Sequence, residues 1–119
     1  MQKDKTIQKV TSLYKHYIEQ QSDYNYVVNE DQFHSLCKSV DNMKKISDKL
    51  GGEMKHIELR PREIVGGITV IVPILDLFGE TLQAFTEVLK TASAVGIDIQ
   101  DGKICVSVTM PDIFNRISF

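Results

Sequence analysis

The sequence predicts an α+β fold, with two N-terminal helices followed by a β-hairpin–helix–β-hairpin unit (ααββαββ) and one mainly antiparallel four-stranded sheet. Three observations lead to this prediction. Apolar residues recur at helical spacing in the first half of the chain, alternate with polar residues in the last third, and form a nearly unbroken run over residues 64–78. That run is too short to cross a bilayer, which takes about 20 apolar residues, so we expect a buried strand there.

Length and composition indicate one domain. We expect residues 1–119 to form a single domain with a core large enough to need no disulfide or metal. The formal net charge of −2 argues against a protein built mainly to hold nucleic acid. Two cysteines and an N-terminus without an apolar leader region favour a cytoplasmic location. Lysine outnumbers arginine 11 to 3 and isoleucine outnumbers leucine 13 to 8, a bias typical of AT-rich bacterial or phage genomes.

Two helices are expected before the sheet. Residues 3–20 place apolar side chains on one side at helical spacing. Asn29 is expected to cap the second helix, with Gln32 at its third position and Gly51 as its stop. The residues between the two helices include a brief β-prone run, 26–28. The second helix is predicted to bury the stripe Phe33, Leu36, Val40, Met43, Ile46 and Leu50.

The first hairpin is predicted to turn at Gly66-Gly67, because a two-residue type I′ turn needs φ > 0 at both central positions. This turn would pair Val65 with Ile68 and would make residues 68–77 the inner strand. Both faces of that inner strand are apolar, so each must be covered either by helices or by a second subunit.

The third helix is predicted over residues 80–95, where Gly96 would end it. The second hairpin follows, with Asp101-Gly102 as its turn. Its apolar residues all fall on one face, which we therefore expect to be buried against the core. The turn aligns two apolar pairs across this hairpin, Ile99–Ile104 and Ile97–Val106.

No residue is assigned to catalysis, to a cofactor or to a metal. The sequence contains no glycine-rich phosphate loop. His34 and Cys37 lie three residues apart on one predicted helix, but no second pair completes a metal site. Cys105 and His56 could approach each other across the sheet as a nucleophile and its base, although free cysteines on strands are usually inert.

Two groups of residues are candidates for a partner surface. All four tyrosines fall within thirteen residues, and tyrosine is favoured at interfaces, although packing at the edge of the core explains them too. Polar residues alternate along a predicted edge strand over residues 56–63, either to bind phosphate or carboxylate or to block aggregation. The candidate partner-binding residues are Tyr14, Tyr17, Tyr24, Tyr26, His56, Glu58, Arg60 and Arg62.

These features predict a small non-enzymatic protein-interaction or assembly domain that forms a homodimer, without a cofactor and without membrane contact. One alternative is a nucleic-acid-binding regulator that uses the basic stretch 44–62. Residues 44–63 contain four acidic residues beside six basic ones, which weakens that alternative. The second alternative is a small-ligand-binding or catalytic domain with a pocket between the sheet and the helices.

Overall fold

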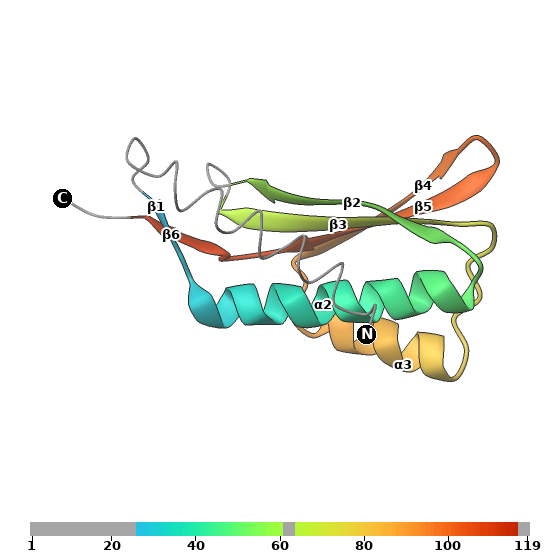
Figure 1. The fold of residues 1–119 in the computed structure, drawn as a ribbon, viewed down its shortest axis with the longest axis horizontal. Helices are drawn as coiled ribbons and strands as arrows, with labels where there is room; N and C mark the ends of the chain where they lie inside the picture. Colours follow the sequence, from blue (N-terminus) through green and yellow to red (C-terminus); the bar gives the residue numbers. More distant parts are fainter. Residues whose placement is uncertain (1–25, 61–63, 117–119) are drawn as a thin grey trace, which may run out of the picture.

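The computed structural model describes residues 26–60 and 64–116, and these form two helices on one side of an antiparallel sheet (Figure 1). The predicted α+β class and the four-stranded antiparallel sheet are confirmed, whereas the predicted helix over residues 3–20 lies outside the described residues. In chain order the elements are β1 (Tyr26–Val28), α2 (Glu30–Lys49), β2 (Glu53–Arg60), β3 (Val65–Val72), α3 (Glu80–Leu89), β4 (Ala94–Gln100), β5 (Lys103–Met110) and β6 (Phe114–Arg116).

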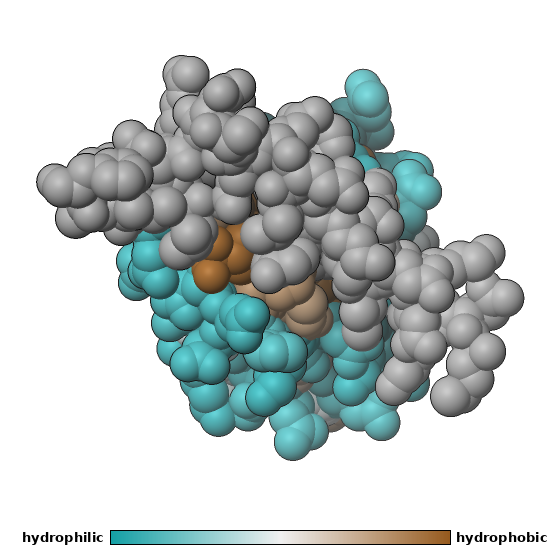
Figure 2. All heavy atoms as spheres, turned by 60° about the vertical axis from the view of Figure 1, so that its left-hand side comes forward, coloured by the Kyte–Doolittle hydropathy of each residue, from teal (hydrophilic) through white to brown (hydrophobic). Residues whose placement is uncertain are grey.

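The strands form two sheets. The larger sheet has the order β2-β3-β5-β4, so β2 and β4 are its edges among the described strands. The smaller sheet pairs β1 with β6 and joins the start of the described chain to its end. Seen from the end of the molecule that carries this small sheet, the described side chains are mainly hydrophilic, with one small hydrophobic area near the centre (Figure 2).

Helix α2 forms as the sequence predicts. The side chain of Asn29 accepts a hydrogen bond from the Gln32 N–H at 3.4 Å, which satisfies one of the free amides of the first turn. Glu30 and Asp31 place negative charge at the same end, where the helix dipole favours it. Gly51 follows the helix with φ of +70°, a conformation that favours glycine. The predicted apolar stripe of α2 is buried or partly buried throughout.

The predicted hairpin turn at Gly66-Gly67 is wrong. Both glycines lie inside β3, and Val65 pairs with Arg60 rather than with Ile68. The inner strand also ends earlier than predicted, since β3 stops at Val72, directly before a proline that cannot donate to a sheet ladder. The first hairpin therefore has a register with Arg60 opposite Val65, which a turn at the paired glycines does not produce.

Gly66 is required by packing instead of by a turn. A Cβ atom at this position would lie 3.1 and 3.3 Å from the two Cδ atoms of Leu36 and 3.4 Å from Cγ1 of Ile113. Glycine in a strand often marks such a close approach. The missing side chain therefore lets α2 lie against β3.

Helix α3 is shorter than the predicted helix over residues 80–95, because the chain from Ala94 onward pairs with β5. Gly96, predicted to stop the helix, lies within β4. The second hairpin is confirmed: Asp101 and Gly102 have φ of +53° and +76°, and Ile99 lies opposite Ile104. Strand pairing thus takes precedence over the helical spacing of residues 90–95.

The core lies between the sheet and α2, which packs on β2 and β3. Ile68, Val70 and Val72 of β3 are fully buried on this side. One face of the inner strand is therefore covered by a helix of the same chain. On the opposite face Thr69 is buried and its hydroxyl lies 3.2 Å from that of Ser107. No second helical layer covers this opposite face among residues 26–60 and 64–116.

Candidate functional site

The face of the sheet opposite the helices carries a polar groove of about 240 Å³. His56 and Arg60 flank Glu58 on β2, each with a side-chain nitrogen 3.7 Å from a carboxylate oxygen of Glu58. The structure therefore brings together three of the predicted partner-binding residues. The groove is lined by Lys55, His56, Glu58, Arg60, Gly67, Ile68, Thr69, Gln100, Cys105, Ser107, Val108 and Thr109.

The groove is concave because the sheet curls. Lys55 Nζ donates a hydrogen bond to Gln100 Oε1 at 2.7 Å, although the two residues belong to β2 and β4, the opposite edges of the sheet. Below them Cys105 is buried on the polar face. The contact is possible because the curvature of the sheet brings its two edges together. The bonded side chains are exposed, so this hydrogen bond adds little stability.

The predicted approach of Cys105 and His56 is realised only in part. Both line the groove, but no hydrogen bond joins them in the described part of the chain, and His56 Nε2 lies 3.7 Å from a carboxylate oxygen of Glu58. A cysteine nucleophile needs a base within hydrogen-bond reach. The arrangement therefore lacks the contact that would activate the thiol.

The predicted pair His34 and Cys37 also stays incomplete. His34 is exposed, while Cys37 is half-buried, and burial raises the pKa of the Cys37 thiol above its ordinary value. Metal ligation needs the thiolate, which this burial disfavours. Among residues 26–60 and 64–116, no three His, Cys, Asp or Glu side chains gather to hold a metal ion.

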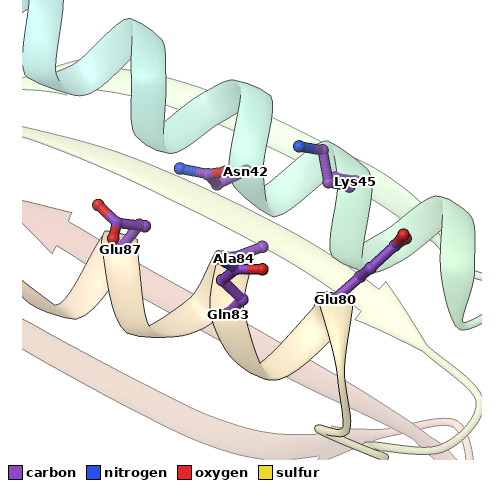
Figure 3. Close-up of a pocket in the computed structure, with 6 residues that line it drawn as sticks. All are labelled: Asn42, Lys45, Glu80, Gln83, Ala84 and Glu87. Atoms are coloured by element: carbon purple, nitrogen blue, oxygen red, sulfur yellow. The ribbon is translucent and has the colours of Figure 1, made fainter.

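A second groove, of about 530 Å³, runs between the two helices and is open to solvent. Asn42 and Lys45 project into it from α2, and Glu80, Gln83 and Glu87 from α3 (Figure 3). Its polar groups carry charges of both signs. A surface of this composition is typical of a solvated seam between two helices, and ligand pockets are usually more apolar.

The basic stretch 44–62 presents less free positive charge than its lysine and arginine count suggests. Lys44 Nζ lies 3.3 Å from Asp48, and Lys49 Nζ lies 3.1 Å from Glu80. A carboxylate also lies beside the guanidinium of Arg60. Nucleic acid binding relies on basic side chains that can contact phosphates. These acidic neighbours therefore weaken the case for a nucleic-acid surface.

Strand β4 is the most exposed apolar element described. All seven of its residues are exposed, including Val95 (38%), Ile97 (60%) and Ile99 (73%). These three lie opposite buried or partly buried residues of the β5 core face, so their side chains project from the helix side of the sheet. Folding of the described chain therefore leaves a row of β-branched side chains in water.

Helix α3 extends this apolar row. Thr81, Ala84 and Val88 are its buried residues. Leu82 and Leu89 lie on the flank turned away from α2 and are 49% and 47% exposed. Because α2 covers β2 and β3 and packs against α3, a flank of α3 turned away from α2 is on the β5–β4 side of the sheet. We call this set the apolar edge surface: Leu82, Leu89, Val95, Ile97 and Ile99.

Sequence reasoning missed the apolar edge surface because it counted every apolar residue of the third helix and the second hairpin as buried. One signal was available: residues 94–100 contain neither proline nor lysine, the usual protection of an exposed strand. Tyr26 begins β1 opposite Arg116 in the smaller sheet. The other predicted partner-binding residues, Tyr14, Tyr17, Tyr24 and Arg62, lie outside the described residues.

Comparisons with protein-family models, with curated proteins and with solved structures gave no match for this chain. Within the described ranges, neither helix has the length and apolar character needed to cross a membrane.

Proposed function

We propose that this protein is a small non-enzymatic interaction or assembly domain that forms a homodimer through the apolar edge surface. The observation that carries the proposal is the exposure of the whole of β4, with its row of β-branched side chains. Contiguous exposed apolar patches on folded proteins usually mark contact sites. Unpaired strand edges also supply backbone donors and acceptors to a partner.

The two edges of the sheet differ in a way that supports this proposal. β2 carries Lys55, His56, Glu58 and Arg60 and has a register shift near its start, and charges and bulges of this kind block edge-to-edge pairing. β4 has one charged residue, Asp98, and its register with β5 is regular. One edge is thus protected against pairing, and the other is suited to it.

Light scattering after size-exclusion chromatography tests this function over a range of micromolar concentrations. Wild type is expected to pass from monomer to dimer as concentration rises. Ile97→Glu should weaken dimerisation at least tenfold, because burying an isoleucine side chain contributes about 1.5–3 kcal/mol and a symmetric dimer loses two. Gln83→Glu, which adds the same charge at an exposed position of α3 that lines the groove facing α2, should dimerise like wild type.

A wild-type chain that stays strictly monomeric throughout this range contradicts the proposal. Equal weakening by Ile97→Glu and Gln83→Glu does so too, because added charge would then explain the effect without any role for the surface. Both substituted positions are exposed, so each variant should unfold within about 1 kcal/mol of wild type.

A further inference from the structure

We infer that two copies of this chain pair through β4, antiparallel and with Ile97 on the twofold axis, so that the two sheets join into one of eight strands. The inference rests on the proposed function and specifies its partner and register. It follows from the backbone pattern of β4, from the order of its side chains and from the position of α3.

The backbone of β4 alternates between its two neighbours. In a hairpin with a two-residue turn, the residues flanking the turn, here Gln100 and Lys103, form a hydrogen-bonded pair, and such pairs alternate with non-bonded ones along the ladder. The N–H and C=O groups of Val95, Ile97 and Ile99 therefore point away from β5. These residues also carry the exposed apolar side chains. One partner strand would therefore both bond to the free backbone groups and cover the apolar side chains.

One contact in the structure agrees with this alternation. The N–H of Ile99 donates a hydrogen bond to Oδ1 of Asp98, its own neighbour in the chain, at 2.8 Å. The Ile99 amide is thus bonded to a side chain, as expected for an amide that β5 does not use. In the dimer this N–H would exchange the carboxylate for the carbonyl of Val95 in the second copy.

Symmetry and charge select the register. We call Val95, Ile97 and Ile99 outward-facing because their backbone N–H and C=O groups point away from β5. If these residues form the hydrogen-bonded pairs of the dimer, a twofold axis at Gly96, Ile97 or Asp98 uses most of the strand. An axis at Asp98 would place two carboxylates directly opposite each other, which is destabilising. An axis at Gly96 would leave Ile99 opposite a residue before the strand begins. An axis at Ile97 pairs Val95 with Ile99 twice and uses all three outward-facing residues.

The Ile97 register also suits both faces of the sheet. On the polar face it sets Gly96 opposite Asp98, and a Cβ at Gly96 would meet nothing within 4 Å, so the carboxylate has room. On the helix side it gathers three β-branched residues from each copy. Leu89 lies toward the Val95 end of β4, since only residues 90–93 connect the two elements, and Leu82 lies toward the other end. Antiparallel pairing therefore brings Leu89 of one copy toward Leu82 of the other.

The occupant is a second copy because the strand is complementary to itself. The sequence Val95-Gly96-Ile97-Asp98-Ile99 reads as apolar, small or polar, apolar in either direction about Ile97. A twofold contact needs this match between a surface and its own rotated copy. A foreign strand would need no such symmetry.

Cysteine cross-linking tests the register in a chain whose own Cys37 and Cys105 are replaced by alanine. Ile97→Cys alone should form a disulfide-linked dimer, because the two Cα atoms of a hydrogen-bonded pair lie about 5.5 Å apart, within disulfide range. Val95→Cys alone and Ile99→Cys alone should not, because each residue lies about 14 Å along the strand from its copy. A mixture of these last two variants should cross-link.

The outcomes separate the register from the function. If Ile97→Cys alone forms no cross-link, but mixed cross-links join Val95→Cys to Ile97→Cys chains or Ile97→Cys to Ile99→Cys chains, the Ile97 register is overturned in favour of a shifted one. A chain that dimerises by light scattering but forms none of these cross-links overturns pairing through β4, while the proposed function stands. A strictly monomeric parent chain overturns both.

Discussion

Alanine substitutions at Gly66 and Gly67 should have opposite effects on stability, although the two residues are neighbours. Both lie in β3, where glycine costs about 0.5–1 kcal/mol relative to alanine because of its greater backbone freedom in the unfolded chain. At Gly67 a new Cβ would lie 3.7 Å from Arg60 Nη2 and 3.9 Å from the Val108 carbonyl oxygen, which are ordinary contacts. Gly67→Ala should therefore stabilise the fold by about 0.5–1 kcal/mol.

At Gly66 the same methyl group would press on Leu36 at 3.1 and 3.3 Å. Both residues are buried, and overpacking a core costs about 1–3 kcal/mol. This cost exceeds the gain in the unfolded state, so Gly66→Ala should destabilise by about 0.5–2 kcal/mol.

Urea denaturation in an Ile97→Glu background measures both effects without a contribution from association. The two variants should differ by at least 1 kcal/mol, with Gly67→Ala the more stable. A hairpin turn at these glycines predicts another result, since both would need φ > 0 and each alanine would cost about 1–2 kcal/mol. Equal destabilisation by both substitutions would thus refute the register of the first hairpin.

Three further predictions concern the cap, the thiol and the edge. Asn29→Ala should lower the free energy of unfolding, measured in urea, by about 1 kcal/mol, because the Gln32 amide loses its capping hydrogen bond. An unchanged free energy of unfolding would show that the 3.4 Å contact does not stabilise the helix. The raised pKa of Cys37 favours the protonated thiol in the folded state, so this contribution to stability is present below the ordinary thiol pKa and is lost as pH rises through the folded value. Wild type should therefore lose more stability than Cys37→Ser in an alkaline titration, and parallel curves would contradict this. Asp98→Asn should tighten dimerisation several-fold at low salt by removing like charges on both sides of the axis, an effect that high salt should abolish.

Local signals predicted much of the fold. The cap at Asn29 and the stop at Gly51 defined α2 within one residue, because both act on neighbouring backbone groups. The turn at Asp101-Gly102 fixed every pair of the second hairpin for the same reason.

The errors arose where distant residues decide. Gly66 has the sequence appearance of a turn, but its role depends on Leu36, thirty positions earlier. Residues 90–95 have helical spacing, yet the last two of them, Ala94 and Val95, pair with β5, which follows them in the chain. Neither tertiary contact can be read from the local pattern of apolar residues.

The candidate surface was harder to predict than the fold. The spacing of Leu82 and Leu89 on α3, and of Ile97 and Ile99 on β4, is that of buried residues, and sequence periodicity does not say what covers an apolar face. The predicted charged edge at His56, by contrast, lies on an edge strand as expected.

Residue-resolved amide hydrogen exchange of wild type at low and high concentration tests the pairing of β4 most directly. The amides of Gly96 and Asp98 bond to β5 in either state and should be protected at both concentrations. The amides of Val95, Ile97 and Ile99 should exchange fast in the dilute protein and become protected as the concentration rises. If these three amides exchange equally fast at both concentrations while the protein dimerises, the contact lies elsewhere and the account of β4 is wrong.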